Sequence, residues 1–187
     1  MIKIGGETRI ISMIASMSMD NVIGANNDML WSMPADLRHF YRKTVKHCVI
    51  MGRNTQRSIT WPLESRINIV ISSKPGYAAD GFVVVGSLME AVDRAFRYAK
   101  RFNEQIDAAG NCTSEIFLIG GQSVYEQGLA YADRLYLTQI YAEYRGDVFF
   151  PDLDATQWVE RSCEHYDVDA NNVNPYSFFE YSRRSDN

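Results

Sequence analysis

The sequence predicts an α/β fold: a single domain with a mostly parallel central β-sheet of about eight strands, flanked by helices and extended by a C-terminal antiparallel hairpin. Three observations support this prediction. The 187 residues, 46% of them hydrophobic, suit one sizeable core. Short β-branched runs alternate with helical patterns, as in βαβ units. The last third instead alternates polar and apolar residues with the two-residue period of strands that have one wet face.

The central strands are expected where apolar residues are almost continuous, because parallel strands are covered on both faces. These runs are residues 10–16, 49–51, 67–71, 81–85 and 116–119. Between the last two, Ser87 and Glu90 match a capping box, which predicts a helix whose apolar face continues to residue 99. The polar segment 101–114 is expected to form a surface loop.

The C-terminal strands are expected at residues 134–141, 158–166 and 176–182. The last two are separated by the turn-rich link 167–175. Such a link suits an antiparallel hairpin added to the edge of a parallel sheet.

Composition excludes several function classes. A net charge of −4 and a pI near 5.4 give no electrostatic footprint for nucleic acid or for an anionic membrane. The three cysteines are far apart and lack nearby histidines, so neither a disulfide framework nor a metal site is expected. No stretch reaches membrane-spanning length, and the N-terminus lacks an apolar export signal. A soluble, cytoplasmic protein is expected.

Asp36 is the most informative single residue. Pro34 fits the first position of a helix and Met33 its cap. An inward-facing stripe is predicted at helical spacing, and Asp36 borders it one turn before Phe40. The acid either complements the helix dipole, the commoner role of such residues, or binds a ligand with hydrogen-bond donors and a flat apolar body. The predicted stripe consists of Leu37, Phe40, Tyr41 and Thr44.

Three predicted strands end in turns that suit anions. Each alone is also explained by a surface charge or a tight turn, but all three follow strand C-termini, where open α/β sheets bind ligands. Together they predict a dinucleotide cradle. The paired glycines do not form the Gly-x-Gly-x-x-Gly fingerprint, so a standard Rossmann domain is disfavoured. The turns contain Gly52, Arg53, Asn54 and Thr55; Ser72, Ser73 and Lys74; and Gly120, Gly121, Gln122, Ser123, Val124 and Tyr125.

Seven motifs follow one another along the chain: residues 20–24, 31–37, 50–55, 67–73, 119–121, 137–138 and 146–151. In order and spacing they resemble the dihydrofolate reductase family, most closely its bacterial chromosomal type, from about residue 10 to residue 183. Residues 1–9 are then an N-terminal extension and 10–187 one dihydrofolate-reductase-like domain. The resemblance implies NADPH-dependent reduction of 7,8-dihydrofolate to tetrahydrofolate, dihydrofolate and antifolate inhibitors as ligands, and a monomer.

For the substrate, the resemblance implies that Asp36 accepts hydrogen bonds from the pterin 2-amino group and N3, supported by Thr138. Arg66 would pair with the glutamate α-carboxylate. Hydride goes to C6 and a solvent-derived proton to N5, promoted by Asp36, whose pKa burial should raise. The lid, residues 21–31 with Met29 at its centre and Trp31 at its end, would close over the site. The implied substrate-binding set is completed by Ile14, Leu37, Phe40, Ile59, Leu63 and Ile119.

For the cofactor, the resemblance implies NADPH, with Arg53, Thr55 and Ser73 on the adenosine phosphates. Gly120 to Val124 would form the pyrophosphate turn, and Tyr125 would lie near the reacting ring. The neighbours of the nicotinamide and its ribose would be Ala15, Ile23, Gly24 and Ile119.

The chain departs from the family pattern at several positions. Gln56–Arg57 replaces an aromatic–acidic pair, Gln122 replaces a small residue, and Leu30 replaces a proline. Such divergence suits an acquired, trimethoprim-insensitive variant or equally a distant chromosomal enzyme. Two other classes share part of the pattern: an NADPH-dependent pyrimidine reductase of riboflavin synthesis and a catalytically silent nucleotide-binding module. Asp36 argues against both.

Overall fold

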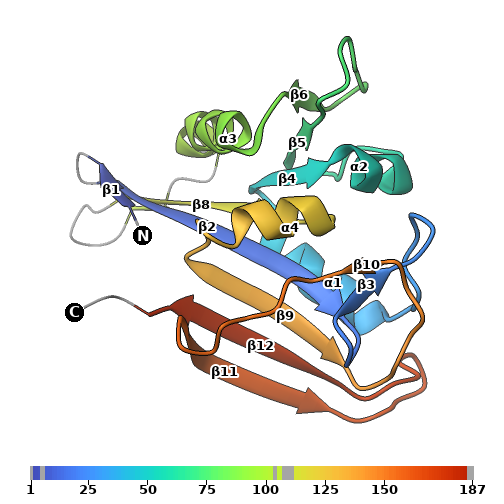
Figure 1. Cartoon of the computed structure of the whole chain (residues 1–187). Helices are drawn as coiled ribbons and strands as arrows, with labels where there is room; N and C mark the ends of the chain where they lie inside the picture. The colour runs from blue at the N-terminus through green and yellow to red at the C-terminus, as the bar shows by residue number, and fades with distance from the viewer. Residues whose placement is uncertain (1, 5–6, 103–104, 107–111, 185–187) are drawn as a thin grey trace.

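The computed structural model describes residues 2–4, 7–102, 105–106 and 112–184. One large twisted sheet runs through the molecule, with helices on both of its faces (Figure 1). Its strand order is β11-β12-β9-β2-β8-β4-β5-β6. The predicted eight-stranded, mostly parallel sheet with a C-terminal hairpin is therefore confirmed.

Six neighbouring strands are parallel to one another, and the hairpin continues the sheet with antiparallel pairs. Two very short strands, β1 (Ile2–Ile4) and β7 (Gln105–Ile106), pair with β2 and β8. The parallel strands are β9 (Arg134–Ile140), β2 (Glu7–Met17), β8 (Cys112–Leu118), β4 (Cys48–Gly52), β5 (Ile67–Ile71) and β6 (Val83–Val85); the hairpin is β11 (Trp158–Tyr166) and β12 (Tyr176–Arg183).

Alternate side chains of the strands point into two cores, one on each face of the sheet. On one face, α3 (Leu88–Phe102) and α4 (Gln122–Gly128) pack against side chains such as Met13 and Leu118. On the other face, side chains such as Ile14 and Phe117 pack against residues from α1 (Pro34–Thr44) and α2 (Arg53–Ile59). Because successive strand residues point to opposite faces, one run of apolar residues serves both cores.

Helix α1 begins where the sequence predicts. Met33 is extended (φ −131°, ψ 94°) and Pro34 begins the helix, but the cap comes from elsewhere: the amide of Ala35 donates to Oδ1 of Asn172, 3.1 Å away in the hairpin link. Asn172 is buried, and Asp169 holds both its backbone and its side-chain amide. The hairpin link therefore fixes the start of the helix that carries Asp36.

The predicted inward stripe of α1 is wrong in part. Leu37 and Tyr41 are 54% and 50% exposed, whereas Asp36 and Thr44 are buried and Phe40 is half-buried. Phe40 and Thr44 point inward as predicted, whereas Leu37 is exposed because it lines a cavity and Tyr41 lies at the surface. Asp36 does not border the buried face; it lies within it.

A second, two-stranded sheet lies beside the large one. It pairs β3 (Val22–Gly24) with β10 (Val148–Phe149), antiparallel. Sequence periodicity did not predict either strand, because two or three residues are too few to show a period. Figure 1 shows this pair at the end of the large sheet towards which β2 runs.

Some predicted boundaries shift. Strand β6 starts at Val83 instead of residue 81, because Gly81 (φ 79°) lies in a turn closed by a hydrogen bond from Phe82 to Ala79. The expected loop 101–114 is wrong at both ends: α3 continues to Phe102, and β8 begins at Cys112, where parallel pairing with β2 outweighs local polarity. Residues 103–104 and 107–111 of that loop lie outside the described residues. Strand β2 already begins at Glu7, inside the segment expected to be an extension.

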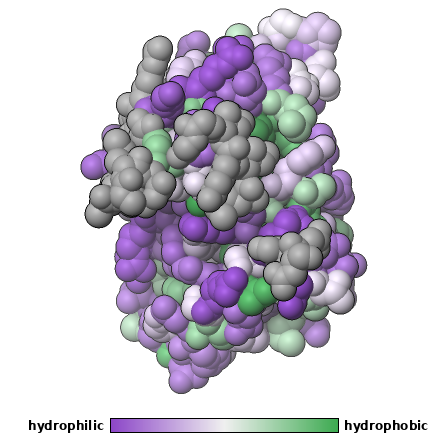
Figure 2. Space-filling view, turned by 90° about the vertical axis from the view of Figure 1, so that its left-hand side faces the viewer, coloured by the Kyte–Doolittle hydropathy of each residue, from purple (hydrophilic) through white to green (hydrophobic). Residues whose placement is uncertain are grey.

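The surface around the β1 end of the sheet is mixed. Figure 2 shows hydrophobic residues there only as patches scattered among hydrophilic ones, with residues of uncertain placement in grey. None of the helices in the described part of the chain is long and apolar enough to cross a membrane.

Replacing Asn172 with alanine should destabilise the protein by about 1 kcal/mol, the usual cost of losing a helix cap. The change removes the acceptor for the Ala35 amide and the side-chain hydrogen bond to Asp169, which keeps those from the backbone amides of residues 171 and 172. Urea unfolding of the wild type and Asn172→Ala measures the loss, with Asn171→Ala, on the exposed side of the same link, as the control. Equal midpoints for the wild type and Asn172→Ala would show that the hairpin link does not hold α1.

Candidate active site

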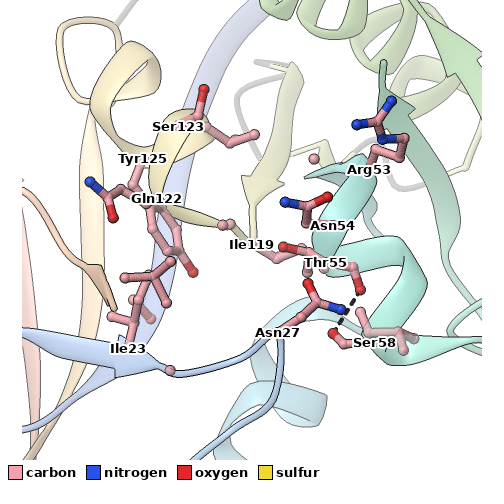
Figure 3. A pocket seen from close by; sticks show the side chains of 18 of the residues that line it. Ile23, Asn27, Arg53, Asn54, Thr55, Ser58, Ile119, Gln122, Ser123 and Tyr125 are labelled. Carbon is pink, nitrogen blue, oxygen red and sulfur yellow. Dashed lines mark hydrogen bonds between the residues drawn. The ribbon is translucent and has the colours of Figure 1, made fainter. Parts of the chain in front are cut away.

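A cavity of about 990 Å³ lies at the C-terminal ends of the parallel strands. Strand β2 contributes Ile14 to Ser16, and the turns after β4, β5 and β8 contribute polar and glycine-rich segments. The N-terminal half of α1 forms the wall behind them. Figure 3 shows side chains from α2, α4 and β3 around this one space. The position is the one where open α/β sheets bind ligands.

Asp36 is the acid of this cavity. It is 7% exposed, and burial raises its pKa above the ordinary value of 3.8, as the sequence predicted. The Thr138 hydroxyl, and to a lesser degree that of Ser16, favours the charged form and opposes this shift. The oxygen of Ser16 is itself buried and makes no hydrogen bond of normal geometry within the described residues. The site thus offers a carboxylate and a hydroxyl with unused hydrogen-bonding capacity.

The glycine pair forms a tight turn beside the acid. A side chain at Gly120 would clash with the Tyr125 ring at 2.9 Å, and Gly120 has a φ of 101°, which favours glycine. A side chain at Gly121 would lie 3.2 Å from Oγ1 of Thr55. The Tyr125 hydroxyl donates to the carbonyl of Ile14 (2.8 Å), and burial raises its pKa. The turn therefore leaves bare backbone exposed to the cavity, and Tyr125 ties it to β2.

Three cations surround a smaller pocket of about 490 Å³ next to the first. Arg53 and Arg57 lie one turn apart on α2, and Lys74 faces them from the turn after β5. Tyr77 completes the lining: its hydroxyl donates to Oε1 of the buried Gln56 (2.5 Å), and the Arg53 guanidinium lies 5.9 Å from its ring centre. This arrangement suits a phosphate monoester.

A buried asparagine, Asn68, holds the segment that forms the wall opposite Asp36. Asn68 accepts a hydrogen bond from the Leu63 amide and donates to the carbonyls of Leu63 and Arg66. Leu63 and Ile59 line the cavity. The Arg66 guanidinium lies beside it, 5.7 Å from the Phe40 ring centre, and donates a hydrogen bond to Oγ1 of Thr44. The Asn68 side chain therefore holds the backbone of residues 63–66 in place.

The predicted lid is a short hairpin. Asn26 and Asn27 have positive φ angles, and Ala25 and Asp28 pair on either side of them, as in a tight β-turn. The amide of Asn26 donates to Oδ2 of Asp147 (3.2 Å). Met29 lines the cavity and is 48% exposed.

Most of the predicted site residues line the large cavity. The exceptions are Trp31, Arg66 and Thr138, which lie behind or beside its wall, and Lys74, which lines only the smaller pocket. Trp31 is buried against Tyr144. The residues found in the large cavity are Ile14, Ala15, Ile23, Gly24, Met29, Asp36, Leu37, Phe40, Gly52, Arg53, Asn54, Thr55, Ile59, Leu63, Ser72, Ser73, Ile119, Gly120, Gly121, Gln122, Ser123, Val124 and Tyr125.

Sequence reasoning missed several residues of these pockets. Among them, Ser16 lies two residues after Ile14 and so on the same strand face. Arg57 follows Arg53 at i+4 spacing, which places both on one helix face. Gly86 and Ser87 follow β6 as the other turns follow their strands, although the local sequence indicates only a capping box.

The residues present fit a phosphorylated dinucleotide. Bare backbone at Gly120 and Gly121 and the hydroxyls of Thr55 and Ser73 line the middle of the cavity, and the cationic pocket lies at one end. Across the described ranges, no group of three or more His, Cys, Asp or Glu side chains could hold a metal ion.

Comparisons with known proteins agree with this geometry. A family model described as dihydrofolate reductase matches residues 10–183. Dihydrofolate reductase of Bacillus subtilis is 36% identical over 176 residues, covering 94% of this chain and 96% of the relative. Dihydrofolate reductase type 3 of Salmonella typhimurium is 37% identical over 175 residues, covering 94% and 99%.

A solved structure gives the same result. The dihydrofolate reductase of Enterococcus faecalis, complexed with NADP(H) and RAB-propyl, has a TM-score of 0.81 and 27% sequence identity, covering 94% of this chain and 97% of that chain. Fold, pocket and sequence therefore define the class. The chain belongs to the dihydrofolate reductase family.

Replacing Asp36 with asparagine should not destabilise the fold near pH 7 and should change how stability depends on pH. Since burial raises the folded-state pKa, folding retains a proton that the unfolded chain has lost. The wild type therefore loses stability as pH rises from 3.8 through the folded pKa, and Asp36→Asn lacks this loss. Melting temperatures of both proteins across this range test it. A wild type whose advantage over Asp36→Asn grows with pH would contradict the raised pKa.

Proposed function

We propose that this pocket reduces 7,8-dihydrofolate to 5,6,7,8-tetrahydrofolate with NADPH, and that Asp36 is the residue that binds and polarises the pterin. The observation that carries the proposal is the buried carboxylate of Asp36, which lies in a cavity whose apolar walls suit a flat ring. A ring with adjacent amino and N–H donors would supply the hydrogen bonds that this acid lacks.

The chain's own residues would act on the substrate as follows. Asp36 accepts hydrogen bonds from the 2-amino group and N3 of the pterin, and Thr138 orients the carboxylate. Phe40 and Leu37 on one side and Ile59 and Leu63 on the other enclose the ring and the aminobenzoyl group, and Arg66 pairs with the glutamate α-carboxylate. The negative charge of Asp36 raises the proton affinity of the pterin, so that N5 takes its proton from solvent.

The cofactor would occupy the rest of the cavity. When bound, NADPH supplies the hydride that reaches C6 of the pterin. Ala15, Ile23, Gly24 and Ile119 would position its reacting ring, the Gly120–Gly121 turn its pyrophosphate, and the cationic pocket its 2′-phosphate. The lid would exclude water from the reacting atoms while leaving a path for the proton to N5.

Neither alternative class uses this geometry as well. A silent nucleotide-binding module has no need of a desolvated acid, which costs stability. A pyrimidine reductase of the same fold is disfavoured because the matched relatives are dihydrofolate reductases over nearly their whole length. Loss of NADPH absorbance with dihydrofolate, and none with a riboflavin-pathway pyrimidine, decides between them.

The proposal extends to a monomeric, cytoplasmic protein that also binds antifolates. Residues of a single chain line both pockets, which supports a monomer. Sedimentation tests the oligomeric state, and inhibition by trimethoprim tests whether this variant is insensitive to it.

Asp36→Asn should lower the rate of hydride transfer at about pH 7 roughly a hundred- to a thousandfold, the usual effect of losing one preorganised electrostatic interaction. Because proton supply then limits the reaction, the rate should recover as pH falls. Single-turnover rates across a pH series measure this, with NADPH affinity as the control, since Asp36 lies on the substrate side. Wild-type rates in Asp36→Asn near pH 7 would refute the central role of this carboxylate.

Arg53→Ala should weaken NADPH binding roughly ten- to a hundredfold and leave NADH nearly unchanged, because it removes a charge-assisted bond to the 2′-phosphate. Arg57→Ala should show the same selectivity at a smaller size, about two- to fivefold, since its side chain is exposed. Arg97→Ala, an exposed arginine on α3, is the matched control. Equal losses for both cofactors would place the 2′-phosphate elsewhere.

A further inference from the structure

Gln122 occupies an unusual position between the cofactor turn and the lid. It is the first residue of α4 and directly follows Gly120 and Gly121. Its side chain makes two hydrogen bonds: Oε1 accepts from the backbone amide of Phe149 (2.9 Å), and Nε2 donates to Oε1 of Glu126 (2.8 Å). Figure 3 shows it on the pocket wall above Ile23. Because the carboxylate of Glu126 can only accept, it fixes which end of the amide faces Phe149.

The amide that Gln122 binds belongs to the strand that supports the lid. Phe149 and Val148 form β10, which pairs with Val22 and Gly24 of β3. Around this pair, Asp147 accepts from the amide of Asn26, and the amide of Phe150 donates to Asn21. Residues 147–150 therefore contact the lid at four positions: Asn21, Val22, Gly24 and Asn26.

On its core side, helix α4 also contacts the residue that follows β10. The Phe150 ring is buried and lies 5.0 Å from the Tyr125 ring. That contact is part of the main core and serves folding. Gln122 provides the polar link on the pocket side, and it joins two elements, the glycine turn and the small sheet, that both line the cavity.

We propose that Gln122 is a positioning residue that couples the Gly120–Gly121 turn to the lid. A ligand bound at the glycine turn would also immobilise the start of α4. Gln122 would then hold β10 in place, and β10 would hold β3 and residues 21–31 over the cavity. The consequence for hydride transfer rests on the proposed function, whereas the coupling itself does not. Losing one hydrogen bond of this kind shifts an opening equilibrium roughly two- to tenfold.

Amide hydrogen exchange of the whole chain tests the coupling directly. In Gln122→Ala, residues 21–31 should exchange about two- to tenfold faster than in the wild type, with NADPH and without it, while exchange in β2 and β8 stays unchanged. Gln127→Ala is the matched control: it is on the same helix, but its side chain bonds only to Ser123 in the contacts described. Its lid should exchange at the wild-type rate.

A swap variant separates positioning from general damage. In Gln122→Glu combined with Glu126→Gln, the carboxylate at position 122 can still accept from Phe149, and the new amide at 126 can donate to it. This double variant should restore wild-type exchange in residues 21–31. Unchanged lid exchange in Gln122→Ala, or no restoration by the swap, overturns the proposal.

Single-turnover reduction of dihydrofolate distinguishes this proposal from the proposed function. The rate in Gln122→Ala should fall by the same two- to tenfold factor as the lid opens more often, and the swap should recover it. Lid exchange that responds while the reduction rate does not would leave the coupling standing and would count against the catalytic role given to the lid.

Discussion

The cost of burying one carboxylate shapes the whole site. Asp36 can remain ionised only if nearby groups offset its desolvation, and Thr138 on β9 is the first of these. Keeping the two together requires α1 to lie flat on the sheet at a fixed depth. The hairpin link achieves this through Asn172, which caps the helix start, and Asp169, which holds Asn172. The C-terminal hairpin therefore determines the geometry of an acid more than a hundred residues earlier in the chain.

The parallel sheet supplies what the acid needs opposite it. Strands β4 and β8 pair as far as Ile50 and Leu118, and beyond that pairing the amide of Gly52, the last residue of β4, donates to the carbonyl of Gly120 (2.7 Å). This bond brings the turn after β4 against the glycine pair, so that both line one cavity. Polar side chains beyond the strand ends need not be buried in the core, and ligand-binding residues are therefore found there.

Strong local signals made most of the fold predictable, and tertiary contacts decided the rest. Continuous apolar runs located five of the six parallel strands, whereas the sixth, β9, was predicted from a two-residue alternation although it is parallel to β2 and mostly buried. Pro34 located the start of α1. The face that α1 buries was predicted only in part, because spacing does not distinguish an apolar residue that lines a cavity, as Leu37 does, from one in the core. The small β3–β10 sheet and the Gln56–Tyr77 pair join segments distant in sequence. Arg57 was visible as a charge, but only the fold shows which pocket it faces.

The tip of the predicted lid has fewer supports than its base. Asn26 and Asn27 at the tip are exposed, and the hydrogen bond from the Asn26 amide to Asp147 holds the tip, whereas Val22 at the base is buried. Displacing the tip would therefore break a few polar contacts and leave the buried side chains in place. Losing one hydrogen bond at the base of the lid would change the position of the lid. The position of Asp36 would stay the same, because the sheet and the hairpin link hold it. Rigid chemistry and a movable cover can then coexist in one small domain, because their supports are separate.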